Sequence, residues 1–364
     1  MSVRAIDRSK STHLHLQLRE LLLDGIRRGE WQVGSRLPSI RELIDRHQVS
    51  LPVVRMALDA LVETGIIRSE PGRGSFVVRV PEGGAMPLVL FMLCNRSRLD
   101  PYFSRVLSGA ERAASAAGCL LVFRQIEPDD GDGVGRVLGS IAIDGVVCTG
   151  DIDDRSYRAL VDSGVPFVLA GGLWRQQPAP PEVRIIGNDN FQGGRLATAH
   201  LLAAGHRRIA LITGPVEGRH WKQRRLGYEA ALREAGIALD PGLMVESLID
   251  TADAAEPVLG RLFASGPACT ALFAGNDRYA LGAYRVLRAL GRRPGLDVSI
   301  VGYDDLDFGE TLDPPLSSIQ PDIEGTGEGA VALLVEALAG QPSRQVLRRV
   351  RLVERASVTP LVDA

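Results

Sequence analysis

The first 80 residues contain two kinds of hydrophobic pattern. Between residues 12 and 28, apolar residues recur every three or four positions, which predicts one amphipathic helix that ends at Gly29. The apolar positions of this helix are Leu14, Leu18, Leu21, Leu22 and Ile26. From residue 66 to residue 80, polar and apolar residues alternate around a turn at residues 71–74, which predicts a β-hairpin.

Two short helices are predicted between these segments. Ser39 and Glu42 have the S-x-x-E spacing of a capping box, so a second helix begins after Pro38. Ser50 is expected to cap a third helix, whose first turn tolerates Pro52 because first-turn amides have no partner within the helix. The predicted buried face of this third helix consists of Val54, Leu58, Leu61 and Val62. Three helices followed by a hairpin predict a winged helix-turn-helix domain over residues 1–80.

The pattern changes after residues 81–87, PEGGAMP, which are predicted to form a short linker. Beyond it, short apolar strands alternate with helices, and this alternation predicts parallel sheets. The predicted strands are residues 87–94, 119–124, 145–150, 166–172, 208–214, 243–248, 271–276 and 297–305. The predicted helices are residues 102–117, 133–140, 155–163, 191–204, 222–235, 253–264 and 278–290. Residues 88–364 therefore predict an α/β domain of two lobes, with ligands bound outside the carboxyl ends of the strands.

Charge is distributed unevenly between the two parts of the chain. Residues 1–87 hold 13 Lys and Arg against 10 Asp and Glu, whereas the remaining residues hold 29 against 34. A basic head on an acidic body favours nucleic-acid contact at the N-terminus. No apolar run approaches the roughly 20 residues that a membrane span requires, and no signal peptide is recognisable. We therefore expect a soluble protein that is not exported.

Cysteine usage and glycine spacing argue against several kinds of site. The four cysteines form no CxxC pair and are expected to be reduced core residues of a cytoplasmic protein; they are Cys94, Cys119, Cys148 and Cys269. Gly193-Gly194 fits neither a P-loop nor a dinucleotide fingerprint, so no nucleotide site is predicted. His206 is expected to order a turn and not to bind a metal. No metal and no cofactor is predicted.

The N-terminal motifs resemble the DNA-binding head of GntR-type regulators. LPSIRELI stands where that family has LPS-x-R-x-LA, followed by VS-x-x-x-VR-x-AL and a G-x-G wing at Gly72 and Gly74, and the resemblance covers residues 12–78. It implies DNA contact by Ser39, Arg41, Ser50, Leu51, Pro52, Arg55 and Arg73. Leu51 departs from the family, which usually has arginine at this position, so only an apolar base contact is expected there. For Arg55, an ion pair with Asp59 at i,i+4 is the alternative.

The body resembles the sugar-sensing domain of LacI-type repressors, which is similar to periplasmic sugar-binding proteins. The motifs that carry this resemblance are NDNFQGGRLATAHLLAAGHRRIALITGP (188–215), RRLGYEAAL (224–232), ALFAGNDRYALGAYRVLRALG (271–291), DVSIVGYDDLDFGETLDPPLSSIQPD (297–322) and LVERAS (352–357). They follow the family's order over nearly all of residues 88–360. A GntR-type head on a LacI-type body resembles the arrangement of arabinose repressors.

The resemblance implies effector contacts by six residues. They are Asn95, Tyr102 and Phe103 in the first lobe and Arg224, Asn276 and Asp304 in the second. A guanidinium, an amide and a carboxylate suit the hydroxyls of a polyol, although Tyr102 and Phe103 also fit a plain core.

Neighbouring positions need separate interpretation. Asp277 and Asp305 are expected to cap a helix or to hold a loop. Gly171 stands where many relatives carry an aspartate, and whether Trp174 or Arg175 replaces that contact stays open.

These observations predict a homodimeric, non-enzymatic transcription regulator. We expect a repressor of carbohydrate-catabolism genes that binds operator DNA and a small sugar-like effector. The alternative is a GntR-headed, enzyme-like regulator of the pyridoxal-phosphate type, which requires a catalytic lysine. Lys222 is the only lysine of the body, and it stands beside the arginine expected to contact the effector. The identity of the effector, the sign of its action and the operator stay open.

Overall fold

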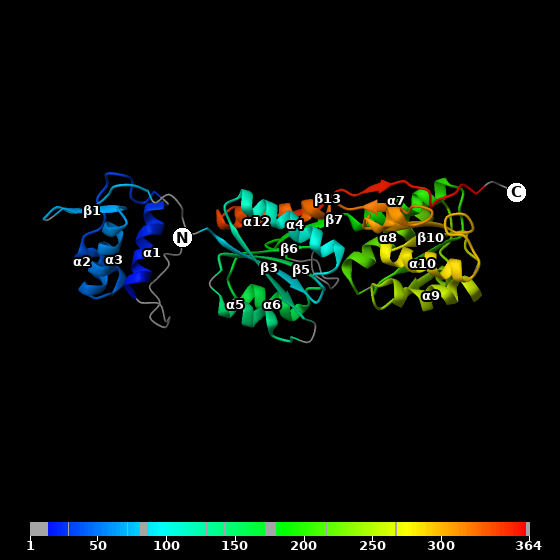
Figure 1. Ribbon diagram of the computed structural model, residues 1–364, viewed down its shortest axis with the longest axis horizontal. Coiled ribbons are helices and arrows are strands. Elements are labelled where there is room, and N and C mark those ends of the chain that lie inside the picture. Colours follow the sequence, from blue (N-terminus) through cyan, green and yellow to red (C-terminus); the bar gives the residue numbers. More distant parts are fainter. Residues whose placement is uncertain are drawn as a thin grey trace. The chain divides into compact units, whose positions relative to one another are not determined.

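The structure is a computed structural model that describes residues 14–27, 29–70, 72–80, 86–127, 130–141, 143–171, 180–215, 217–265 and 268–361. The chain divides into two compact units, Met1–Met86 and Pro87–Ala364 (Figure 1). Most of the predicted linker, residues 81–85, lies outside the described residues, as do Trp174 and Arg175. No helix in the described ranges is both long enough and apolar enough to cross a membrane.

The first unit is a winged helix-turn-helix, as predicted. Its elements are α1 (Leu14–Arg27), α2 (Ile40–His47), α3 (Leu51–Glu63) and the antiparallel strands β1 (Ile67–Glu70) and β2 (Gly74–Val77). Ser39 and Glu42 form the predicted capping box: the Glu42 N–H donates to the Ser39 hydroxyl, and the Ser39 N–H donates to the Glu42 carboxylate. Ser50 is the N-cap residue of α3, but its side chain makes no capping hydrogen bond.

One detail of the predicted buried face of α3 is wrong. Val62 is 38% exposed, and Ala57 is buried on α3 instead, because Ala57 shares the face of Val54 and Leu61 whereas Val62 lies toward its edge. On α1, Leu23 is buried and Leu21 only partly so. The apolar core of the head thus uses a slightly rotated face of both helices.

The second unit contains two sheets, which form two lobes. The strands of lobe 1 are all parallel, in the order β13-β7-β6-β5-β3-β4. Their bounds are β3 (Leu88–Cys94), β4 (Leu120–Ile126), β5 (Gly145–Gly150), β6 (Phe167–Ala170), β7 (Arg184–Asn188) and β13 (Gln345–Arg348). Helices α4 (Pro101–Ala116) and α12 (Ile323–Leu338) cover one face, and α5 (Gly133–Ser140) and α6 (Asp154–Asp162) cover the other.

The sheet of lobe 2 has the order β14-β12-β11-β10-β8-β9. Its strands are β8 (Ile209–Thr213), β9 (Met244–Glu246), β10 (Ala271–Ala274), β11 (Ser299–Tyr303), β12 (Ser317–Gln320) and β14 (Arg351–Val353). Helices α7 (Asn190–Ala203) and α8 (Arg219–Glu234) pack on one face, and α9 (Ala252–Ser265) and α10 (Asp277–Ala289) pack on the other. The short helices η1 (Pro241–Leu243) and α11 (Phe308–Thr311) complete the lobe. The sheet is parallel, as predicted, except for the edge strand β14, which pairs antiparallel with β12.

The chain crosses between the lobes three times. It passes from β7 to α7, returns from β12 to α12, and passes again from β13 to β14 (Figure 1). Consequently α12 and β13 belong to lobe 1 although they follow the strands of lobe 2 in the sequence. The crossovers leave the carboxyl ends of both sets of parallel strands facing the space between the lobes, which is where ligands bind in such sheets.

Close packing of α7 on α8 explains Gly193-Gly194. A Cβ atom added at Gly194 would lie 2.0 Å from the backbone oxygen of Arg224, and one added at Gly193 would lie 2.5 Å from the ring of Tyr303. Only a residue without a side chain permits this approach. Gly194 therefore allows α8 to lie against α7 and sets the position of Arg224, while Gly193 makes room for the ring of Tyr303 at the end of β11.

Candidate functional site

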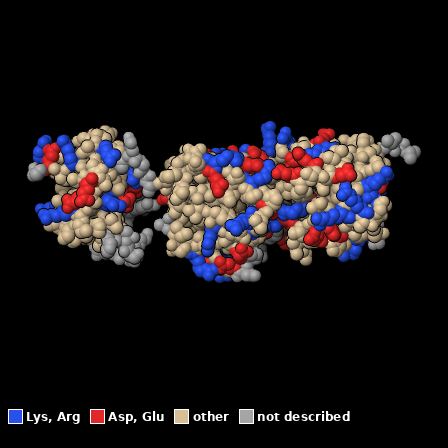
Figure 2. All heavy atoms as spheres, viewed as in Figure 1, with Lys and Arg blue, Asp and Glu red and all other residues tan. Residues whose placement is uncertain are grey.

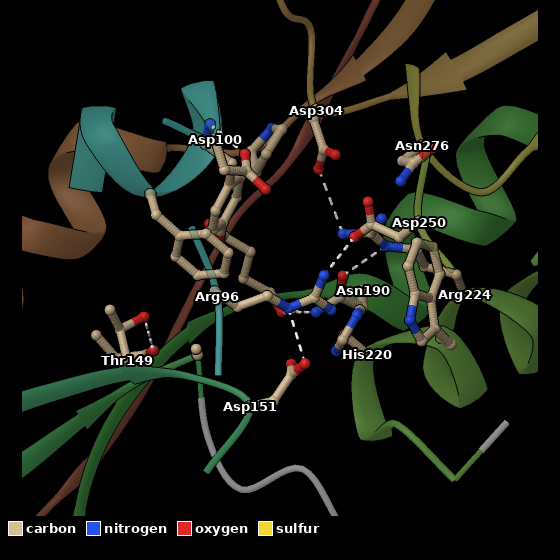
Figure 3. A pocket seen from close by; sticks show the side chains of 18 of the residues that line it. Arg96, Asp100, Thr149, Asp151, Asn190, His220, Arg224, Asp250, Asn276 and Asp304 are labelled. Atoms are coloured by element: carbon tan, nitrogen blue, oxygen red, sulfur yellow. Dashed lines mark hydrogen bonds and ion pairs between the residues drawn. The ribbon is translucent and has the colours of Figure 1, made fainter. Parts of the chain in front are cut away.

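A cleft lies between the two lobes. Loops that follow β3, β5 and β6 line it from lobe 1, and residues of α8 and α10 and the loops after β9 and β11 line it from lobe 2. Figure 3 shows the labelled side chains pointing into this space from both sides. The cleft brings together five of the six predicted effector contacts, namely Tyr102, Phe103, Arg224, Asn276 and Asp304.

Arg224 lies at the floor of the cleft, with 6% of its surface exposed. Its Nε donates to Asn190 Oδ1 at 2.9 Å, and its Nη1 donates to the Gly275 carbonyl at 2.6 Å. Its Nη2 donates to Asp304 Oδ1 at 3.4 Å. The guanidinium also stacks on Tyr303, 3.5 Å from the ring centroid. Since these contacts come from three separate segments, the guanidinium of α8 is held rigidly where α7, β10 and β11 meet.

Asp304 follows β11 with a φ of 103°, a left-handed conformation that is strained for a residue with a side chain. The strain directs its carboxylate toward Arg224, where only 6% of the residue is exposed. Burial raises the pKa of Asp304 to about 6, while Arg224 and Arg278 act in the opposite direction. At neutral pH the group is therefore mainly an ionised acceptor of hydrogen bonds.

Asn276 begins α10 and caps it. Its Oδ1 accepts from the Tyr279 N–H at 2.8 Å, so its Nδ2 is the part that faces the cleft. Asn190, at the start of α7, lines the same space and was not predicted. It could have been suspected, because it stands directly after a crossover between the lobes.

A chain of ion pairs spans the cleft, and sequence reasoning missed it. Asp250 Oδ2 lies 2.9 Å from Arg96 Nη1, and Asp250 Oδ1 lies 2.8 Å from Arg278 Nη1. Arg96 Nε lies 2.8 Å from Asp151 Oδ2, and Arg278 Nη2 lies 2.7 Å from Asp100 Oδ2. We call these five residues the cleft network, and Figure 3 labels four of them, Arg96, Asp100, Asp151 and Asp250. Two of its contacts join the lobes, Arg96 with Asp250 and Asp100 with Arg278.

Asn95 does not line the cleft, and its neighbour Arg96 does. The backbone of Asn95 has a φ of 55°, and its Nδ2 donates to the Asp151 carbonyl at 2.9 Å. This left-handed turn holds the loop after β3 and presents Arg96 to the cleft. Asparagine is one of the few residues that adopt this conformation readily, so its place after a strand was a usable signal.

Two aromatic side chains from the start of α4 line the lobe 1 side. Tyr102 and Phe103 pack edge to face, with ring centroids 5.1 Å apart. Burial raises the pKa of Tyr102 to about 12, so its hydroxyl stays protonated. Gly171, at the end of β6, also lines the cleft and has a φ of 105°. The two residues considered as its replacement lie outside the described part of the chain.

The contacts of Asp277, Asp305 and His206 show which of the roles considered for them each residue has. Asp277 accepts from the Leu306 N–H and the Ser318 hydroxyl, each at 2.7 Å, and Asp305 contacts Arg355, so both hold loops as expected. The ring of His206 contacts Thr270 and Thr359, which confirms its role in a turn. Among the described residues, no cluster of His, Cys, Asp or Glu could hold a metal ion. Lys222 does not line the cleft.

In the head, the predicted DNA contacts lie on α2, α3 and the wing. Arg41 and Arg55 are exposed and form no ion pair within the described residues, so the pairing of Arg55 with Asp59 is not observed. Leu51 is 41% exposed, beside Ser50 and Pro52 at the start of α3. Arg73, at the wing, pairs with Glu70 at 2.7 Å. The Ser39 hydroxyl is occupied by its capping bond.

Surface charge alone does not mark a binding face. On the face of the body that Figure 2 shows, basic and acidic side chains are interleaved. The DNA-contacting face of the head and the cleft of the body are therefore recognised by the positions of individual arginines and not by net charge.

Comparison with known proteins shows which protein families the two units match. Residues 14–77 match the family of bacterial regulatory proteins described as gntR, and residues 198–358 match the periplasmic binding protein-like domain. The HTH-type transcriptional regulator CelR of Thermobifida fusca is 32% identical over 303 residues, covering 82% of this chain and 87% of CelR.

Solved structures show the same relationship. A complex of the transcriptional regulator CelR with cellobiose has a TM-score of 0.70 and 29% identity, covering 93% of this chain and 98% of that chain. A lac repressor dimer bound to operator and the anti-inducer ONPF has a TM-score of 0.67 and 25% identity, covering 76% of this chain and 96% of that chain.

Proposed function

Because this chain belongs to the LacI family of transcriptional regulators and carries a head of the gntR family, we propose that it represses carbohydrate-catabolism genes under control of a sugar-like effector. It acts on DNA in the cytoplasm and catalyses no reaction. The effector binds in the cleft between the lobes. It closes them further or holds them closed, and this changes the fraction of molecules that is competent to bind DNA.

The observation that carries this proposal is the chemistry of the cleft. Arg224 uses three hydrogen bonds within the described chain, and a guanidinium has five N–H groups, so two are left for a ligand. The Asp304 carboxylate accepts and the Asn276 amide donates within the same space. Donors and acceptors at such short spacing suit adjacent hydroxyls of a sugar. Phe103 and Tyr102 offer an apolar surface for the ring face.

The head reads operator DNA through α3 and the wing. Arg55 and Arg41 are exposed on the helix-turn-helix and carry no competing carboxylate among the described residues. In such domains the first turn of the recognition helix enters the major groove while nearby side chains grip phosphate. Leu51 then offers an apolar contact, for instance to a thymine methyl group. Arg73 contacts DNA by exchanging Glu70 for phosphate.

The functional unit is a homodimer assembled by the body. Three large apolar side chains near one end of the cleft are exposed: Leu99 at 84%, Leu248 at 80% and Ile249 at 62%. Leu120, on the edge strand β4, is 54% exposed. Burial of such residues in a symmetric contact favours a dimer, and two-fold symmetry requires a nearly palindromic operator.

Two measurements test the regulatory proposal. An operator is first selected from random DNA, and its affinity for the full chain is then measured by fluorescence anisotropy with and without cellobiose, ribose and other neutral sugars. A sugar that shifts operator affinity is next titrated by calorimetry. Arg224→Ala should weaken its binding about ten- to a hundredfold, since a charged hydrogen bond contributes about 1.5–3 kcal/mol, while operator affinity stays near wild type.

The adjacent arginine supplies a matched control. Arg225 pairs with Glu229 outside the cleft, so Arg225→Ala should bind the sugar like wild type. Equal losses in both variants would contradict the assignment of Arg224. Absence of any selected operator sequence would contradict the regulatory function itself.

The dimer is tested separately by sedimentation of the full chain. Leu248→Glu should shift the equilibrium toward monomer because it places a charge in the contact. Leu296→Glu, at a leucine that is 52% exposed elsewhere on the body, should not. A wild-type protein that sediments as a monomer would refute the assembly.

A further inference from the structure

Every arginine that lines the cleft in the described chain already faces a carboxylate of the protein. Arg96 lies within 2.9 Å of both Asp151 and Asp250, and Arg278 lies within 2.8 Å of both Asp100 and Asp250. Arg224 donates to Asp304 at 3.4 Å. Asp250 is shared, one oxygen to each of two arginines, so a guanidinium that turns away toward a ligand loses its ion pair with Asp250.

The residues that line the cleft also include more acidic than basic side chains. Four aspartates, Asp100, Asp151, Asp250 and Asp304, stand against three arginines. His220 adds no positive charge at neutral pH, because burial and the neighbouring arginines hold its pKa well below its usual value. The described cleft therefore presents one net negative charge to whatever enters it.

Helix N-termini could compensate for this by binding an anion, but three of the four at the cleft are already capped. At the start of α7, Asp189 Oδ1 accepts from the Gln192 N–H. Asp100 Oδ1 accepts from the Tyr102 N–H at the start of α4, and Asn276 Oδ1 accepts from the Tyr279 N–H at the start of α10. Only α8, which begins after Gly218, has no side-chain cap. An anion in the cleft is thus attracted by one uncapped helix N-terminus and repelled by four carboxylates.

We propose that the cleft selects an uncharged polyhydroxylated ligand and discriminates against its anionic derivatives, sugar phosphates and sugar acids. The proposal rests on the sensing function proposed above and narrows its ligand class. An anion that takes the place of an aspartate beside an arginine leaves that aspartate charged and unpaired. An anion that approaches the remaining N–H groups of Arg224 meets the Asp304 carboxylate, which lies 3.4 Å from the same guanidinium. A hydroxyl, in contrast, donates to a carboxylate and accepts from a guanidinium without breaking the pair.

Matched ligand pairs test the discrimination on the full chain. Calorimetry at constant ionic strength compares ribose with ribose 5-phosphate, glucose with glucose 6-phosphate and glucose with gluconate, and inorganic phosphate serves as a probe that needs no knowledge of the effector. Neutral members should bind at least about tenfold more tightly than their anionic partners, and phosphate should not bind saturably. A phosphorylated or acidic member that binds more tightly than its neutral partner would overturn the proposal.

Removing one carboxylate should relax the discrimination. Asp250→Asn leaves three aspartates against three arginines, and it frees both guanidinium groups that shared the residue. It should bind phosphate saturably, at least about tenfold more tightly than the weakest binding that the calorimeter detects for the wild type. Asp297→Asn changes the net charge equally but lies on the surface, paired with Arg293, so it should not bind phosphate. Asp304→Asn repeats the test at a residue outside the cleft network.

These outcomes separate the two proposals. Unchanged phosphate affinity in both cleft variants would refute the role of the carboxylates, while operator binding and its response to a neutral sugar would still support the sensing function. Loss of operator binding would refute the sensing function without bearing on the comparison of matched pairs.

Discussion

The ion pair between Asp100 and Arg278 should hold the lobes together, and a double-mutant cycle can measure its strength. Asp100 begins α4 in lobe 1 and Arg278 lies in the first turn of α10 in lobe 2. Asp100→Asn keeps the helix cap because asparagine caps as well as aspartate does. Arg278→Gln leaves the Asn276 cap of α10 in place. Each replacement therefore removes charge while preserving local structure.

The expected coupling follows from geometry and burial. Two unit charges about 4 Å apart attract by roughly 4 kcal/mol at an effective dielectric constant of about 20. The side chains are only 9% and 20% exposed, so solvent screens them weakly. Burial nevertheless raises the pKa of Asp100 in spite of Arg278, which means that desolvation offsets part of the attraction. We therefore expect a coupling free energy of about 1–2 kcal/mol.

Urea unfolding of the full chain gives this quantity. All proteins in the cycle carry Trp31→Phe, so that the two remaining tryptophans, Trp174 and Trp221, both report on the body. The exposed pair Arg293 and Asp297, which are 70% and 31% exposed, provides a reference cycle whose coupling should be small because solvent screens both charges. A coupling between Asp100 and Arg278 no larger than this reference would refute the view that the cleft network joins the lobes.

Three other predictions concern the packing, the titration and the head. Gly194→Ala should destabilise the body by about 1–3 kcal/mol in urea unfolding, because its Cβ would lie 2.0 Å from the Arg224 carbonyl, whereas Gly260→Ala, with open space around it, should stabilise α9 by up to about 1 kcal/mol. The pKa of Asp304 is raised to about 6, so its ionisation lowers the free energy of unfolding by up to about 3 kcal/mol. The whole of this loss applies above pH 6, and none of it applies below about pH 4. Asp304→Asn should accordingly flatten the fall in unfolding free energy between pH 4 and pH 6, and an unchanged slope would contradict the assignment. In operator titrations over a salt series, Arg55→Ala should weaken binding by about 1–3 kcal/mol if it contacts a base or lower the salt slope by about one if it contacts phosphate, and wild-type binding at every salt concentration would place Arg55 off the DNA.

Sequence alone determined the elements whose signals are local. The capping box at Ser39 and Glu42, the glycine that ends α1 and the alternation of the wing all depend on residues within a few positions of each other, and the structure reproduces them. The strand and helix order of the body followed from the same short periods. The motifs then placed Arg224, Asn276 and Asp304 near strand ends, where the fold brings them into one cleft.

Tertiary structure decided what depends on distant segments. Arg96 and Asp250 are 154 positions apart, and Asp100 and Arg278 are 178 apart, so no local pattern relates them. The return of α12 to lobe 1 and the antiparallel β14 likewise depend on which apolar face finds which partner. Arg96, and not the predicted Asn95, lines the cleft because Asn95 has a left-handed conformation, which its hydrogen bond to the Asp151 carbonyl holds in place. Hydrophobic periodicity specifies which face of an element is buried, but it does not specify the partner, and charged side chains find their partners only after that packing is complete.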